Sequence, residues 1–231
     1  MSDTDSFIDE VTEELRRDQL YRNLRRYGWI GILAVVLLVG GAAYSEYRKA
    51  QDAARAQAFG DAMLDALSPA ESAARAEALA AIEAPSAEGG MVVGFLAAAE
   101  QAEAGQTEAA VQTLNDIAMA AETPSIYRQI AQFKALLLQA ETRPAAELRG
   151  GFQSLAEAGG PLRLLAEEQI ALIAVAEGDV EAAIAGYQAI LSDAEVSPDL
   201  QQRALQVIVA LGGEPELGGV PNAADLSGEG N

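Results

Sequence analysis

The chain has 231 residues, with 35 Asp or Glu against 15 Lys or Arg, and a formal net charge of −20. It contains no Cys and no His, which excludes disulfides, zinc sites of the Cys/His kind, thiol nucleophiles and catalysis that relies on an imidazole base. Residues 50–231 hold eight of the cations and 27 of the acids, a net charge of −19. We therefore expect no nucleic-acid binding, because such a surface repels phosphate backbones.

Residues 1–26 are predicted to form an amphipathic cytoplasmic segment. Ile8, Val11 and Leu15 recur at helical spacing, and acids precede arginines along the segment, an order that suits the helix dipole. Two interpretations stay open. The segment is either a docking surface for a partner or an interfacial helix whose arginines meet anionic lipid.

Residues 27–44, YGWIGILAVVLLVGGAAY, carry no charge. A helix of this length spans about 27 Å, close to the hydrocarbon thickness of a bilayer. A buried core helix would be expected to show a polar side, and a signal peptide would begin nearer the start and close with a small-residue cleavage site. We predict a single uncleaved transmembrane helix, with aromatic rings near its ends. The anchor residues are Tyr27, Trp29, Ile30, Leu33, Val36, Leu37, Val39 and Tyr44.

Basic residues on either side of the anchor predict its orientation. Five arginines precede it, and Arg48, Lys49 and Arg55 follow it. The excess before the anchor places the N-terminus in the cytoplasm and the C-terminal domain across the membrane. In a bacterium, this is a single-pass inner-membrane protein with a periplasmic domain.

Residues 45–84 are predicted to form membrane-proximal helices. Helix Ser45–Leu67 continues from the anchor, and a second helix covers Ala70–Glu83, with Ser68 as N-cap and Pro69 at its first position. Ser86–Gly90 is expected to be a loop.

Residues 85–211 repeat. Pro124, Pro161 and Pro198 are spaced by 37 residues, each opens a predicted helix, and further helices are expected over 108–118, 145–158 and 181–194. A period of thirty-odd residues with two helices is typical of a helical solenoid. The predicted fold class is therefore all-α: a transmembrane helix followed by a solenoid of helical hairpins. The alternative is an irregular Ala-rich bundle.

The stretch AEGDVEAAIAGYQAIL resembles the tetratricopeptide (TPR) family. The resemblance makes Gly178 the turn glycine, Ala183 the small residue at the helix crossing and Tyr187 the packing aromatic, and Gly105 and Ala110 match in an earlier unit. The unit around Thr142 departs from the pattern, because threonine replaces the turn glycine and Gly150–Gly151 is expected to interrupt its second helix.

No catalytic or cofactor site is expected. Adjacent acids such as Glu167 and Glu168 point in different directions on a helix, and the glycine pairs lack the lysine of a phosphate-binding loop. We expect no enzyme activity, no cofactor and no metal. Residues 212–231, rich in Gly, Pro and acids, are expected to form a disordered tail.

The opening SFIDEVTEELRRDQLYRNLRRYGWIGILAVVLLVGG, the helix after it and the degenerate repeats together resemble the TPR-like ancillary subunit family of the SecYEG translocon. The resemblance implies two partners, the SecYEG translocon and a periplasmic isomerase-like chaperone, and possible exported client proteins.

The expected function is a membrane-anchored periplasmic scaffold for protein–protein interaction. The alternatives are an assembly factor for another envelope complex, in cytochrome maturation or pilus assembly, and a signalling adaptor acting through its cytoplasmic helix. By the family's spacing, a partner groove would be lined by Val92, Phe95, Gln129, Gln132, Leu136, Leu165, Glu168 and Leu172, although these residues could equally pack on neighbouring helices.

Overall fold

The computed structural model describes the backbone of residues 3–216 and the side chains of residues 25–26 and 28–216. This described part is all-α, with nine helices and no strand. The chain divides into two units, Met1–Gly60 and Asp61–Asn231, and each is treated by itself.

The described residues of the first unit lie within α1, a continuous helix of 64 residues over Asp3–Ala66. From Gly28 onward it is long and apolar enough to cross a membrane. Its apolar side chains are exposed, as shown by Leu38 at 75 % and Val36 at 60 %. The Tyr27 side chain lies outside the described residues. The other predicted anchor residues are all exposed, namely Trp29, Ile30, Leu33, Val36, Leu37, Val39 and Tyr44.

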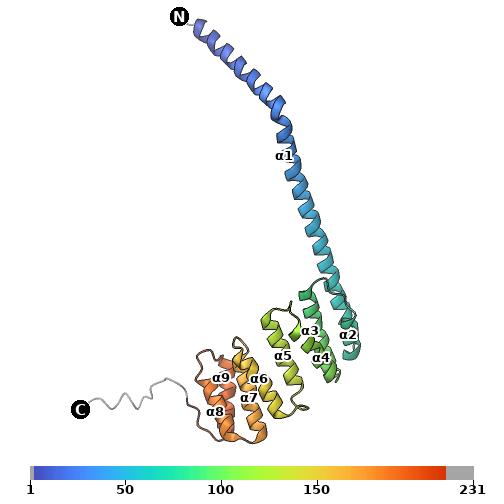
Figure 1. Cartoon of the computed structure of the whole chain (residues 1–231), viewed down its shortest axis with the longest axis vertical. Coiled ribbons are helices and arrows are strands. Elements are labelled where there is room, and N and C mark those ends of the chain that lie inside the picture. Colours follow the sequence, from blue (N-terminus) through green and yellow to red (C-terminus); the bar gives the residue numbers. More distant parts are fainter. Residues whose placement is uncertain (1–2, 217–231) are drawn as a thin grey trace, which may run out of the picture. The chain divides into compact units, whose positions relative to one another are not determined.

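The second unit is an array of short helices in which each helix packs chiefly on the helices before and after it, as the ribbon shows (Figure 1). Because short turns join the helices, neighbours pair as antiparallel hairpins. The helices are α2 (Ser72–Ala80), α3 (Ala87–Glu103), α4 (Thr107–Met119), α5 (Ser125–Leu138), α6 (Ala145–Glu157), α7 (Arg163–Glu177), α8 (Val180–Leu191) and α9 (Pro198–Ala210).

Three buried clusters hold this array together, and each joins three consecutive helices. The first combines side chains of α3, α4 and α5, the second those of α5, α6 and α7, and the third those of α7, α8 and α9. Helices α5 and α7 therefore each contribute to two clusters. Their largest buried side chains include Leu114, Phe152 and Tyr187, which occupy corresponding places on α4, α6 and α8.

The turn between α7 and α8 shows how local sequence sets the hairpin. Gly178 adopts φ +77° at the end of α7, a conformation that costs glycine little. The Asp179 side chain then accepts a hydrogen bond of 3.1 Å from the Ala182 N–H and caps α8.

The segment before α3 differs from the prediction. Helix α2 starts at Ser72 rather than Ala70, and Ser68 does not cap it, because the Ser68 hydroxyl instead donates to the Asp65 carbonyl at 2.8 Å. The expected loop at Ser86–Gly90 is the start of α3, where the Ser86 side chain accepts from the Gly89 N–H at 3.1 Å.

The expectation that Gly150–Gly151 interrupts a helix is wrong, since α6 runs unbroken through both glycines. Gly151 is instead a point of close approach. A Cβ built there would lie 2.6 Å from Leu136 Cδ2 of α5, so the missing side chain makes room for a buried leucine.

After α9, the residues 212–216 are described and lie against α8 and α9. The rest of the predicted disordered tail, residues 217–231, lies outside the described residues.

Candidate functional site

The residues expected to line a partner groove lie on different sides of their helices. On α3, Val92 is 43 % exposed and Phe95 is half-buried. On α5, Leu136 is buried, whereas Gln129 is half-buried and Gln132 exposed. On α7, Glu168 is buried, Leu165 is half-buried and Leu172 is 40 % exposed. The structure therefore does not bring all eight together on one surface.

A hollow of about 170 Å³ does form between α3 and α5, over Leu114 of α4. Phe95 is the one predicted groove residue that lines it. The other lining residues are Ala98, Ala99, Ala102, Lys134, Leu137 and Leu138. We call this the α3–α5 hollow.

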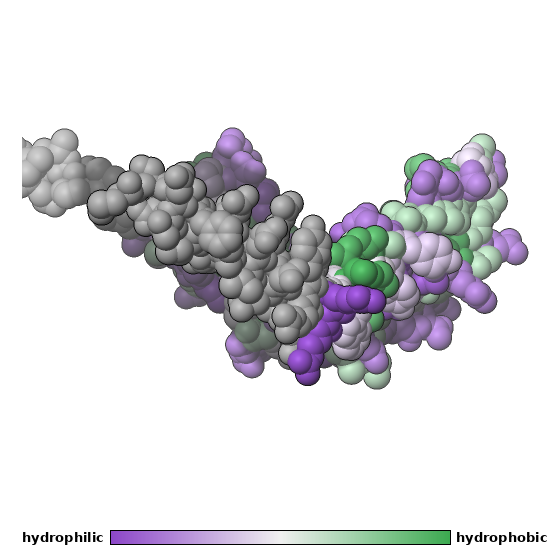
Figure 2. Space-filling view, turned by 90° about the horizontal axis from the view of Figure 1, so that it is seen from above, coloured by the Kyte–Doolittle hydropathy of each residue, from purple (hydrophilic) through white to green (hydrophobic). Residues whose placement is uncertain are grey.

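The α5 side of this hollow is not among the groove residues predicted from the sequence. Tyr127, Lys134 and Leu137 are exposed and share a face of α5 at helical spacing, with Ile130 half-buried between them. Exposed apolar side chains, Tyr127 and Leu137, are therefore present on α5 at or near the α3–α5 hollow. Hydrophobic residues also reach the surface elsewhere, as on α1, and Figure 2 shows hydrophobic and hydrophilic residues side by side on one face of the molecule. In the described residues Lys134 makes no ion pair, so one free cation stands at the edge of this apolar hollow.

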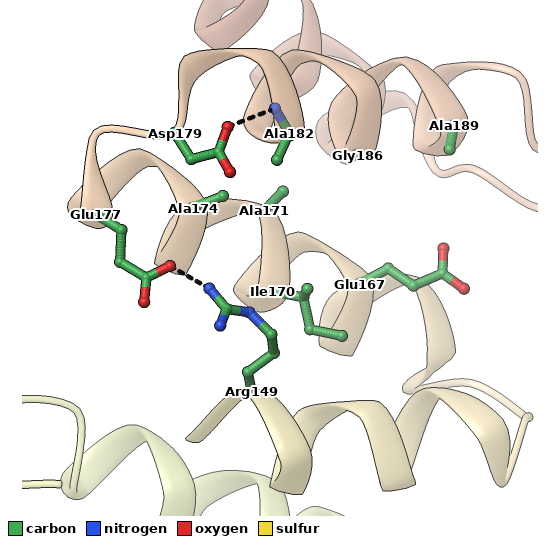
Figure 3. Close-up of a pocket in the computed structure, with 10 residues that line it drawn as sticks. All are labelled: Arg149, Glu167, Ile170, Ala171, Ala174, Glu177, Asp179, Ala182, Gly186 and Ala189. Atoms are coloured by element: carbon green, nitrogen blue, oxygen red, sulfur yellow. Dashed lines mark hydrogen bonds and ion pairs between the residues drawn. The ribbon is translucent and has the colours of Figure 1, made fainter. Parts of the chain in front are cut away.

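A second hollow, of about 450 Å³, lies between α6, α7 and α8 (Figure 3). Its floor is made of small residues, including Ala171 and Ala174 of α7 and Gly186 of α8. A Cβ at Gly186 would lie 3.0 Å from that of Ala171, so these residues allow the two helices to approach closely.

The polar groups of this second hollow are engaged with one another. Arg149 of α6 pairs with Glu177 at the end of α7, and Asp179 caps α8 (Figure 3). No cluster of three or more potential metal ligands occurs among the described residues. The arrangement therefore links α6 to α7 and caps α8.

Ion pairs link helices along the array. Arg75 of α2 pairs with Glu100 of α3 at 2.6 Å, both side chains being 16 % exposed. Arg163 of α7 pairs with Asp193 at 2.9 Å. The hydrogen bond from Arg163, followed by one from the Glu195 backbone N–H, lowers the pKa of the Asp193 carboxyl. These contacts fix neighbouring helices at their ends.

Among the acids of these pairs, Glu168 is the most buried. Glu168 is 7 % exposed, and its two oxygens accept hydrogen bonds from Arg203 Nε at 2.8 Å and Nη2 at 2.9 Å. Tyr187 lies close by and is 1 % exposed. Burial, and next the Glu168 charge, raises the pKa of Tyr187 to about 12.

The predicted repeat-packing residues occupy interior or turn positions. Ala110 and Ala183 have no exposed surface. Gly105 and Gly178 have positive φ, in the turns that follow α3 and α7.

Comparisons with protein-family models, with curated proteins and with solved structures give no match to this chain.

Proposed function

We propose that the protein is a membrane-anchored scaffold for protein–protein contacts, in which α1 supplies the anchor and the array α2–α9 supplies the contact surfaces. The observation that carries the proposal is an apolar helix with no interior to bury it, on the same chain as an array of hairpins. A helix that is apolar all round belongs inside a protein core or in a membrane, and the window of α1 that could span a bilayer is not buried in the structure.

The array is proposed to be TPR-like. Support comes from the 37-residue spacing of Pro124, Pro161 and Pro198 and from contacts made mainly between helices adjacent in sequence. Each unit of such an array buries its apolar face only against its neighbours, which leaves extended surfaces for partners.

The α3–α5 hollow is the proposed contact surface within the array. Its exposed Leu137 and half-buried Phe95 offer apolar area that a partner can bury. Tethering to the membrane raises the local concentration of this surface, so weak contacts become useful.

The partners proposed are the SecYEG translocon and a periplasmic isomerase-like chaperone, because the N-terminal stretch and the repeats resemble the ancillary translocon subunit family. In this proposal the N-terminus is cytoplasmic and the array periplasmic, and exported proteins are the clients.

Purification from gently solubilised membranes tests this function. The full chain should bring down the translocon and the chaperone, whereas a chain ending at Lys49 should keep only partners held by α1. Leu137→Glu should reduce chaperone recovery, because it places a charge in the α3–α5 hollow.

Gln132→Glu is the matched control, since Gln132 is exposed on the same helix but does not line the hollow. Equal chaperone recovery with both variants would exclude the hollow as the contact surface. Recovery of neither translocon nor chaperone with the full chain would reject the proposed partners.

A further inference from the structure

The residues Gly212–Glu216, here called the strap, leave α9 and run back along the array. Gly212 turns the chain with φ +82°. The Gly212 and Gly213 N–H groups donate to the carbonyls of Val209 at 3.0 Å and Ile208 at 2.9 Å. These bonds satisfy the last turn of α9 and direct the strap toward α8.

The strap lies against α8 and α9 and is close to both at Gly213; the surface of the two helices beneath it is here called the groove. A Cβ at Gly213 would lie 2.9 Å from Ile184 Cδ1 of α8 and 3.0 Å from Ile208 Cγ2 of α9. Real Cβ atoms almost never come closer than this to a neighbour, so a larger residue here requires Ile184, Ile208 or the strap itself to move.

Gln188 of α8 holds the other end of the strap through its main chain. The Gln188 Oε1 accepts from the Glu216 N–H at 2.9 Å, and the Gln188 Nε2 donates to the Glu216 carbonyl. An antiparallel strand pairs with a residue through the same two bonds. The side-chain amide therefore recognises an extended polypeptide without regard to the side chain it carries.

The strap takes the place of a helix. Gly186 of α8 meets Ala171 of α7, and Ile208, which follows Ala171 by the 37-residue spacing, is met by Gly213 of the strap. The strap therefore contacts α9 at the position that corresponds to the contact of α8 with α7. No helix follows α9 within the residues that the structure describes.

We propose that the groove between α8 and α9 is a binding site for an extended segment of another polypeptide, and that the strap is its displaceable resident. The two hydrogen bonds between the strap and Gln188 are exposed, which is a feature of a segment that opens easily. This site is separate from the α3–α5 hollow and does not depend on the partners proposed above.

Charge defines the class of partner. Glu214 and Glu216 of the strap are among the 27 acids of residues 50–231, a part of the chain with a net charge of −19. A segment with glycine in the place of Gly213 and with lysine or arginine in place of these two acids makes the same main-chain bonds and gains electrostatic attraction. The groove therefore favours a basic, glycine-containing extended segment over a second copy of this acidic chain.

The test uses the full chain in detergent micelles and a fluorescein-labelled peptide, Leu-Gly-Gly-Lys-Pro-Lys-Leu, measured by fluorescence anisotropy. Gly213→Val should expel the strap and bind the peptide about fivefold or more tightly than the parent chain, because apparent affinity scales with the fraction of free grooves. Hydrogen exchange at the Glu216 amide verifies that the strap has left.

Adding Gln188→Leu to Gly213→Val should abolish binding, whereas adding Gln153→Leu should leave it unchanged. Gln153 is the matched control, since it lies on α6 next to Phe152 as Gln188 lies on α8 next to Tyr187. A chain that ends at Leu211 provides a second strap-free form and should bind as Gly213→Val does.

Absence of binding to both strap-free forms would overturn the proposal and leave the strap as an end cap of the array. Binding that survives Gln188→Leu would overturn the main-chain recognition. A peptide that retains the two glutamates should bind more weakly, and equal affinity would contradict the charge preference.

Discussion

The two adjacent glycines of α6 have opposite surroundings. A Cβ at Gly151 would lie 2.6 Å and 2.9 Å from the Cδ atoms of Leu136, which is 6 % exposed and has little space to move, whereas a Cβ at Gly150 would meet nothing within 4 Å. Gly151→Ala should destabilise the array by about 1–3 kcal/mol through overpacking. Urea unfolding followed by circular dichroism measures the change.

Gly150→Ala is the built-in control, and its effect should have the opposite sign. In the interior of a helix, alanine is favoured over glycine by about 0.5–1 kcal/mol. Two variants that unfold at the same urea concentration would contradict the close approach of α5 and α6.

Tyr187 gives the array a dependence on alkaline pH. Its pKa in the folded chain is about 12, above the ordinary value of 10.0, because of burial and the nearby Glu168 carboxylate. The unfolded chain loses this proton first. The stabilising contribution is therefore complete below pH 10 and declines between pH 10 and 12, by at most about 1.4 kcal/mol per pH unit.

Tyr187→Phe should therefore lose less stability than the parent chain between pH 9 and 11. Tyr127→Phe, which alters a tyrosine that is 42 % exposed, should behave like the parent. The urea midpoints of unfolding at pH 9 and pH 11 measure this loss of stability. Equal losses in the parent, Tyr187→Phe and Tyr127→Phe chains would show that Tyr187 is not the cause.

At the scale of helices, the pair Glu168–Arg203 joins α7 to α9 across α8. Arg203→Met would leave the Glu168 carboxylate buried without its two donors, which should cost about 1–3 kcal/mol. Changing both residues to Met should recover most of this loss, since no buried charge then remains unpaired. Denaturant unfolding of the three chains tests the pair.

Arg143→Met is the control for that experiment. Arg143 and Glu147 are largely exposed and 3.8 Å apart, and such surface pairs contribute about 0–1 kcal/mol. If Arg143→Met lowered the free energy of unfolding as much as Arg203→Met, burial of Glu168 would not explain the cost of Arg203→Met.

The sequence predicts where the helices of the array begin and end better than which side of each helix is exposed. Proline spacing and the turn glycine Gly178 mark helix starts and ends, because these residues restrict the backbone locally. On α5, however, apolar residues occur almost all round the helix, at Ile130, Phe133 and Leu136 to Leu138. Periodicity alone could not select the face with Lys134 and Leu137, since both neighbouring helices need apolar contacts.

Contacts between distant residues were the other part that local patterns could not predict. Gly151 was expected to break a helix because glycine is a poor helix former, yet the space it leaves for Leu136 depends on where α5 lies. The strap was assigned to a disordered tail by composition. In the structure it contacts residues far from it in sequence, including the side-chain amide of Gln188, which lies 28 residues before Glu216.

For the whole molecule, the proposed orientation makes a direct prediction. Protease added to spheroplasts of a bacterium that produces the chain should digest the region after Tyr44 and spare Met1 to Arg26, because the arginines before the anchor stay in the cytoplasm. Immunoblots with a tag at each end give the result. Protection of the C-terminal tag in intact spheroplasts, with digestion after lysis, would reverse the orientation.

The preference of each helix for its neighbours in sequence has a kinetic consequence. Each cluster in the described array joins only three consecutive helices. Little chain entropy is therefore lost before native contacts form, and such topologies fold rapidly. The array can acquire structure progressively, hairpin after hairpin, while the rest of the chain is still being delivered. Its N-terminal hairpins make their buried contacts without the C-terminal hairpins. The strap, which follows α9 in the chain, would pack last.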